Sequence, residues 1–78
     1  MNKQSKTQLS RRRMACHEVI SLTGNSQTLQ VVELTNGYVV GQHPLDGEEA
    51  NTEWLQGTIQ LRQDEKGVRA WYQEQPLT

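Results

Sequence analysis

The chain has 78 residues, 33% of them hydrophobic, and a formal net charge of −1. A chain of this length forms at most one domain with a small core. Its single cysteine excludes an internal disulfide, and it lacks an apolar run long enough for a membrane-spanning helix or a secretory signal. We therefore expect a single-domain cytoplasmic protein without a membrane partner.

The first segment of the chain is strongly basic. Residues 1–13 carry a charge of +5, whereas residues 14–78 carry −6. Because the segment has almost no apolar side chains, it cannot offset the entropy cost of ordering, and we predict a disordered basic tail over residues 1–14. Clustered basic side chains bind phosphates, so the tail is a candidate nucleic-acid-binding element. Its candidate residues are Lys3, Lys6, Arg11, Arg12 and Arg13.

A β pattern begins at Cys16. The alternation of Ile20 and Leu22 predicts a half-buried strand, and Thr23–Ser26 has the composition of a turn. We expect one β domain over residues 15–75, followed by a frayed C-terminus over residues 76–78.

The clearest local signal is Asn36-Gly37 between two apolar runs, which predicts a hairpin with a two-residue type I′ turn. The register follows from the turn. It pairs Thr35 with Tyr38, Leu34 with Val39, Glu33 with Val40, and Val32 with Gly41. This register places Val32, Leu34 and Val39 together on the core face.

A polar acidic loop over residues 45–51 follows Pro44, which ends the preceding strand. A second hairpin is predicted from residues 53–62 and 68–72, with a three-residue loop closed by a bulge at Gly67. This loop would pair Leu61 with Trp71 and place both in the core beside Ile59. The predicted fold class is mainly β, a small antiparallel meander of about five strands forming a curled sheet or an open barrel.

The residues that could carry chemistry do not form a recognisable site. Cys16 and His17 are neighbours in a strand, so their side chains point to opposite faces and cannot act as nucleophile and base. The acidic loop lacks the ligand spacing of a calcium loop, and the two histidines and one cysteine lack the spacing of a zinc site. We therefore expect no enzyme activity, no cofactor and no metal.

The aromatic residues are the candidates for partner binding. Trp54 follows the acidic loop, and we name Trp54, Tyr38 and Tyr72 as possible partner-binding residues. Five strands leave two sheet edges, and a thin core would gain from a partner. The favoured hypothesis is a non-enzymatic protein-interaction module that forms homodimers or binds another protein. The alternative is a small-barrel nucleic-acid-binding protein that uses its basic tail.

Three motifs follow one another along the chain. They are a Val-Val-Glu-Leu strand at residues 31–34, a Pro-Leu pair before an acidic loop, and Thr-Glu-Trp-Leu-Gln-Gly-Thr-Ile at residues 52–59. Over Val31 to Tyr72 the chain resembles small β-rich proteins of gut Bacteroidales. The resemblance implies a bacterial β protein and brings no particular activity. The run Val32–Gly37 is also similar to the strand that precedes a glycine turn in Sm-like barrels.

Overall fold

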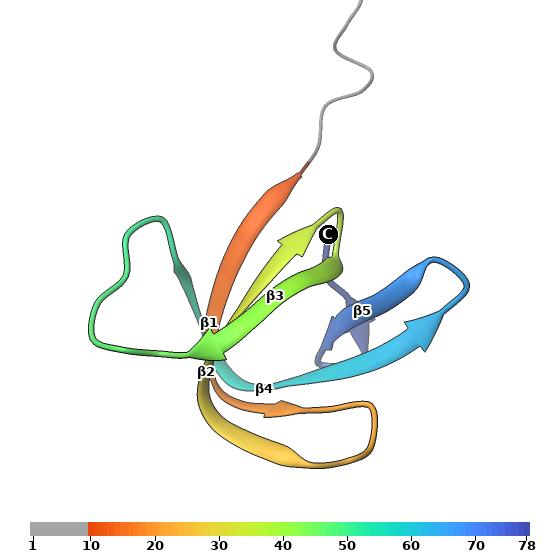
Figure 1. Ribbon diagram of the computed structural model, residues 1–78, viewed down its shortest axis with the longest axis horizontal. Helices are drawn as coiled ribbons and strands as arrows, with labels where there is room; N and C mark the ends of the chain where they lie inside the picture. Colours follow the sequence, from red (N-terminus) through yellow and green to blue (C-terminus); the bar gives the residue numbers. More distant parts are fainter. Residues whose placement is uncertain (1–9) are drawn as a thin grey trace, which may run out of the picture.

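The computed structural model describes residues 10–78, which form one six-stranded sheet that curls into a barrel (Figure 1). The strands are β1 (Arg11–Ile20), β2 (Ser26–Thr35), β3 (Tyr38–Pro44), β4 (Glu53–Asp64), β5 (Gly67–Tyr72) and the short β6 (Gln75–Pro76). Their order in the sheet is β3-β2-β1-β4-β5-β6. Within the described part of the chain no helix is long and apolar enough to cross a membrane.

The barrel closes because β3 also pairs with β5, at Tyr38 and Arg69. The predicted small all-β fold of about five barrel strands is therefore confirmed. The order of the strands differs from a meander, because β4 pairs with β1 and runs parallel to it. Residues 45–52 carry the chain from β3 across to the far side of β1, and they form the wide loop at the left of Figure 1. We call this segment the crossover loop.

Strand β1 begins earlier than predicted, at Arg11 rather than near Cys16. The backbone of Arg11–Arg13 pairs with that of Glu33–Thr35 in β2, so these arginines belong to the barrel and not to a tail. The burial pattern differs too, since Val19 is fully buried while Leu22 lies beyond the strand and is 48% exposed. Lys3 and Lys6 lie outside the described residues.

The core fills the inside of the barrel. Its members come from four strands: Met14, Cys16, Val19, Val32, Leu34, Ile59, Leu61 and Ala70. On the outer side of the sheet Ala15 and Val31 are also buried. Ala15 borders a hollow beneath the crossover loop, so this loop shields apolar surface that a bare barrel would expose to water.

The hairpin at Asn36-Gly37 has the predicted turn, with φ values of +53° and +85° at its two central residues. The pairs of Thr35 with Tyr38 and of Leu34 with Val39 are confirmed. The next predicted pair is wrong, because a β-bulge shifts the register and Glu33 pairs with Gly41. Val40 is the extra residue of the bulge and is 66% exposed.

The second hairpin differs from its prediction by one residue. Asp64 pairs with Gly67, so the loop has two residues, and Leu61 pairs with Ala70 instead of Trp71. Asp64 stabilises this tighter turn, since its Oδ1 accepts the backbone N–H groups of Lys66 at 2.8 Å and Gly67 at 3.2 Å. A shift of one residue exchanges the two faces of a strand. Ala70 therefore fills the core, and Trp71 lies outside it.

The C-terminal residues are part of the barrel, in contrast to the predicted frayed end. Gln75 and Pro76 pair with β5 as β6, and Leu77 packs against the core. The Leu77 N–H donates to the carbonyl of Ala70 at 2.9 Å. The turn between β5 and β6 places Gln73 and Glu74 at φ values of +52° and +67°. Residues other than glycine seldom adopt this backbone conformation.

Candidate functional site

The three aromatic residues predicted to bind a partner lie in different places. Trp54 is 49% exposed beside the crossover loop, where its ring meets that of His17 edge-on at 4.7 Å. Tyr38 begins β3, and its hydroxyl donates to Asp64 of the second hairpin at 2.6 Å. The Tyr72 hydroxyl donates to the carbonyl of Gln56, also at 2.6 Å. These residues do not form one binding surface.

Two of the arginines predicted to bind nucleic acid already have acidic partners. Arg12 makes a two-pronged contact with Glu53 at 2.9 and 3.0 Å, and Arg13 lies 3.0 Å from Glu49. The contact raises the pKa of Arg12 and lowers that of Glu53. A phosphate would have to compete with these carboxylates, which lowers the gain expected from the basic cluster. Binding through these residues stays a prediction.

His43 connects β3 to the crossover loop. Its Nε2 lies 3.0 Å from Glu49 Oε1, and hydrogen bonding to this imidazole lowers the pKa of Glu49. Arg13 contacts the same carboxylate, so Glu49 fastens the loop to β1 and β3 together. The arrangement is a structural latch, which we define as Arg12, Arg13, His43, Glu49 and Glu53.

Cys16 and His17 point to opposite sides of β1, as predicted. The Cys16 thiol is buried in the core, and burial raises its pKa. His17 Nδ1 accepts the backbone N–H of Gly57 at 3.3 Å. Among residues 10–78 no group of three or more His, Cys, Asp or Glu side chains is placed to hold a metal ion.

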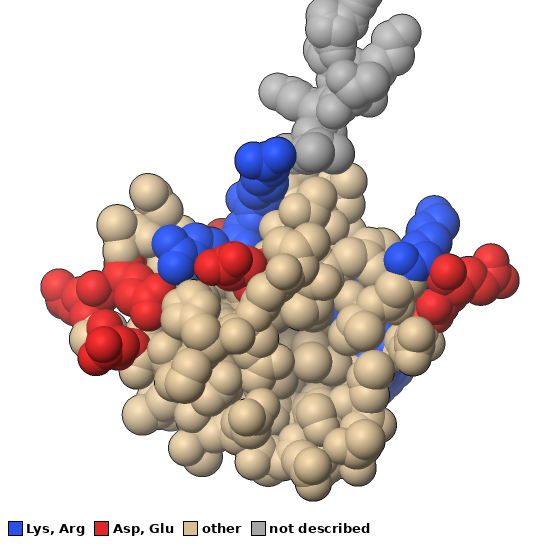
Figure 2. Space-filling view, viewed as in Figure 1, with Lys and Arg blue, Asp and Glu red and all other residues tan. Residues whose placement is uncertain are grey.

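The far end of the hairpin of β1 and β2 carries no charge beyond Glu18, whose carboxylate accepts the Ser26 hydroxyl. Residues 19–32 contain no charged side chain, and Leu22–Leu29 are all exposed. Figure 2 shows the consequence: charges gather at the crossover loop and at the second hairpin, while the lower part of this face carries none. This uncharged surface includes two exposed leucines, Leu22 and Leu29, each at 48%.

One edge of this hairpin has no neighbouring strand. Strand β3 pairs with β2 only from Gln30 onward, and the carbonyl of Leu29 accepts the N–H of Leu45 at 2.8 Å. Before that point Ser26–Thr28 pair with β1 alone in the described part of the chain. We call Ser26–Thr28 the β2 edge. Gln42 steadies it, since its side-chain amide donates to Gln27 at 2.9 Å and to Gln30 at 3.0 Å.

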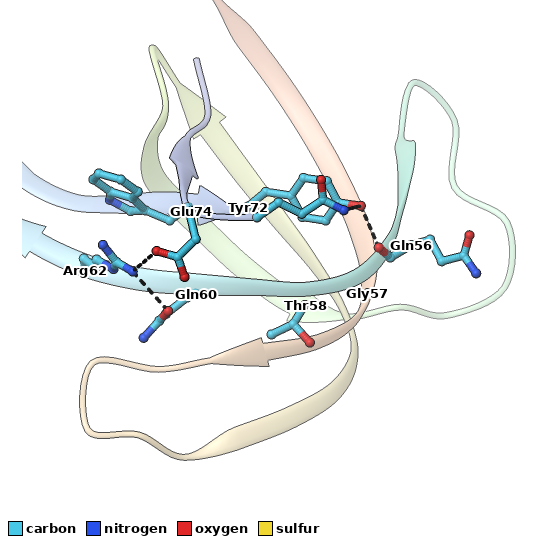
Figure 3. A pocket seen from close by; sticks show the side chains of 9 residues that line it. Gln56, Gly57, Thr58, Gln60, Arg62, Tyr72 and Glu74 are labelled. Atoms are coloured by element: carbon cyan, nitrogen blue, oxygen red, sulfur yellow. Dashed lines mark hydrogen bonds and ion pairs between the residues drawn. The ribbon is translucent and has the colours of Figure 1, made fainter.

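A second surface feature is a groove on the outer side of β4 and β5, shown from close by in Figure 3. It encloses about 280 Å³ and is lined by Gln56, Gly57, Thr58, Gln60, Arg62, Trp71, Tyr72, Gln73 and Glu74. Trp71 sits directly opposite Gln60 in the sheet, and the Arg62 guanidinium lies over its ring at 4.4 Å. We call this feature the β4–β5 groove.

Reasoning from the sequence missed both features. The β2 edge depends on where β3 stops, and the groove depends on the one-residue shift that turns Trp71 outward. One signal was present in the composition: ten of the 78 residues are glutamine. Three of them steady the β2 edge, and three others line the groove.

Comparison with known proteins gives no match: no protein-family model, no curated protein and no solved structure is significantly similar to this chain. The function is therefore inferred from the surfaces described above.

Proposed function

We propose that the protein is a non-enzymatic interaction module that pairs with a second copy of itself along the β2 edge. The observation that carries this proposal is an exposed strand edge without a single charged residue. An unpaired edge offers free backbone N–H and C=O groups to another strand, and proteins that avoid such pairing usually place lysine, proline or a bulge there.

The chemistry of the β2 edge suits a second copy. Two identical strands that pair antiparallel are related by a two-fold axis, so each residue meets itself or its symmetric counterpart. A charged edge would oppose its own like charge in this arrangement, whereas Ser26, Gln27 and Thr28 are neutral. The contact of Gln27 with Gln42 fixes one side chain in advance and so reduces the entropy lost on pairing.

Apolar surface next to the β2 edge also favours a second copy of the chain as the partner. Leu22 and Leu29 are half-exposed on the same hairpin, and a second copy would bury them. Burial of apolar area contributes roughly 25 cal/mol per Å². The described part of the chain has eight buried residues in its barrel core, so burial of two more leucines would add substantially to the buried apolar area.

Sedimentation equilibrium over a wide concentration range tests the proposal. We expect a dimer at high concentration and a dissociation constant raised at least about tenfold by Gln27→Lys, which brings like charges together at the axis. The matched control is Gln63→Lys, because Gln63 is also an exposed glutamine and lies on β4, away from the edge. A protein that remains monomeric at every concentration, or a control as damaging as the edge variant, would contradict the proposal.

We further propose a cytoplasmic location. Cys16 is a free thiol in the barrel core, and an unpaired cysteine is compatible with a reducing compartment.

A further inference from the structure

The β4–β5 groove has a chemistry distinct from that of the β2 edge. We propose that it binds a neutral oligosaccharide, with Trp71 packing against a sugar ring and the side chains of Gln60 and Gln73 hydrogen-bonding its hydroxyl groups.

The charge of the groove favours a neutral ligand. Arg62 and Glu74 are its only charged lining residues, and they lie 3.6 Å apart, so their charges offset each other. Phosphates are attracted by uncompensated basic groups, and ammonium groups by uncompensated acids. The groove offers neither, which disfavours nucleic acid as its ligand.

The polar groups of the groove match hydroxyl groups. A glutamine side chain presents two N–H donors and a carbonyl acceptor, and a hydroxyl both donates and accepts. Gln60 Oε1 accepts weakly from Arg62 at 3.4 Å, and the Gln73 amide donates to the Tyr72 hydroxyl at 3.4 Å. Among the described residues the Gln60 amide N–H groups and the Gln73 carbonyl have no other protein partner, so both can serve a ligand.

Trp71 supplies the apolar part of such a site. The faces of a sugar ring carry C–H groups, and a large aromatic ring gives them a flat surface with low conformational entropy. The Arg62 guanidinium covers one face of the indole at 4.4 Å, so a sugar would pack against the part of the ring that lines the groove. A volume of about 280 Å³ suits a ligand the size of a sugar ring with part of its neighbour.

The backbone at the rim provides independent support. Gln73 and Glu74 both adopt left-handed φ values, which are unfavourable for residues with a side chain. The same kind of turn is built from Asn-Gly at residues 36 and 37, so the chain uses less favourable residues at the groove. Strained backbone of this kind is concentrated at binding sites, and here both side chains line the groove.

Titration of the ¹⁵N-labelled full chain with cellotetraose, mannotetraose and chitotetraose tests the proposal. At least one of these sugars is expected to shift the Trp71 indole signal and the side-chain amide signals of Gln60 and Gln73. The indole signal of Trp54 is an internal control, because Trp54 borders the crossover loop instead.

Two variants test the hydrogen-bonding part. We expect Gln60→Ala to weaken binding about fivefold to tenfold, as the loss of one or two hydrogen bonds predicts, and Gln63→Ala on the same strand to leave it unchanged. Both residues are exposed, so neither change should disturb the fold. The inference is overturned if none of the three sugars shifts Trp71, if the shifts centre on Trp54, or if oligothymidylate perturbs the groove more strongly. Dimerisation through the β2 edge is measured separately and does not depend on this outcome.

Discussion

Gly37 gives the sharpest test of the contact between the turn of β2 and β3 and the C-terminal segment. Its φ of +85° belongs to the turn between β2 and β3, and a Cβ added there would lie 1.9 Å from the carbonyl oxygen of Leu77. Gly24 offers a matched comparison, because its φ is +90° but a Cβ added there meets nothing within 4 Å. Gly37→Ala and Gly24→Ala therefore share a backbone penalty and differ in one contact.

The expected losses in the free energy of unfolding can be estimated from the contacts at each site. The left-handed conformation costs alanine roughly 1–2 kcal/mol at either site. At Gly37 the C-terminal segment must also move, which breaks the bond from the Leu77 N–H to Ala70 and exposes part of the Leu77 side chain. A hydrogen bond of about 1 kcal/mol and a partly buried leucine of about 1–2 kcal/mol add to the penalty. We expect losses of about 3–5 kcal/mol for Gly37→Ala and about 1–2 kcal/mol for Gly24→Ala.

Urea unfolding followed by tryptophan fluorescence measures these free energies of unfolding. Removal of Leu77 and Thr78 completes a double-mutant cycle, because Gly37→Ala then has no carbonyl to displace. In the shortened chain the cost of Gly37→Ala should fall to that of Gly24→Ala. Equal costs of the two substitutions in the full chain, or an excess that persists after the deletion, would refute the reasoning.

Three further results are expected. Ile59→Ala should lower the free energy of unfolding by about 2–5 kcal/mol, because Ile59 is fully buried in the barrel, whereas Val40→Ala at the exposed bulge should change it by less than about 0.5 kcal/mol in urea titrations. The lowered pKa values of Glu49 and Glu53 stabilise the fold above the ordinary carboxyl value of about 4.3, and this contribution is lost as the pH falls through the lowered values, so melting temperatures should drop on acidification and Glu53→Gln should reduce the drop. A flat profile would contradict the role of the latch. The buried Cys16 thiol, whose pKa is raised, should react with a thiol reagent only as fast as the barrel opens, and rapid modification at neutral pH without denaturant would contradict its placement.

The features that the sequence predicts well are local. The turn at Asn36-Gly37 needs only two residues that tolerate positive φ, and the two nearest pairs follow from the length of the turn. The opposite orientations of Cys16 and His17 follow from the alternation of a strand. These conclusions depend on neighbours in the chain, and the barrel did not alter them.

The features that could not be predicted depend on pairing between strands far apart in the sequence, or on a difference of one residue in the length of a loop. The place of β4 beside β1 requires a crossover that no local sequence pattern indicates. The crossover loop and β4 bring Glu49 to Arg13 and Glu53 to Arg12. The groove depends on whether the loop after Asp64 has two residues or three. Both loop lengths are compatible with Asp-Glu-Lys-Gly, yet the length of the loop decides whether Trp71 faces the core or the solvent.

The parallel pair of β1 and β4 also sets the order of folding events. It joins residues about 40 positions apart, as the bond between Gly57 and His17 illustrates, whereas the two hairpins close over a few residues. Hairpins form in about 1–10 μs, while a contact across such a loop waits for a costly closure. We expect the β2 edge to be formed and exposed during that delay. Refolding should therefore slow as the protein concentration rises, because encounters between edges compete with closure of each barrel.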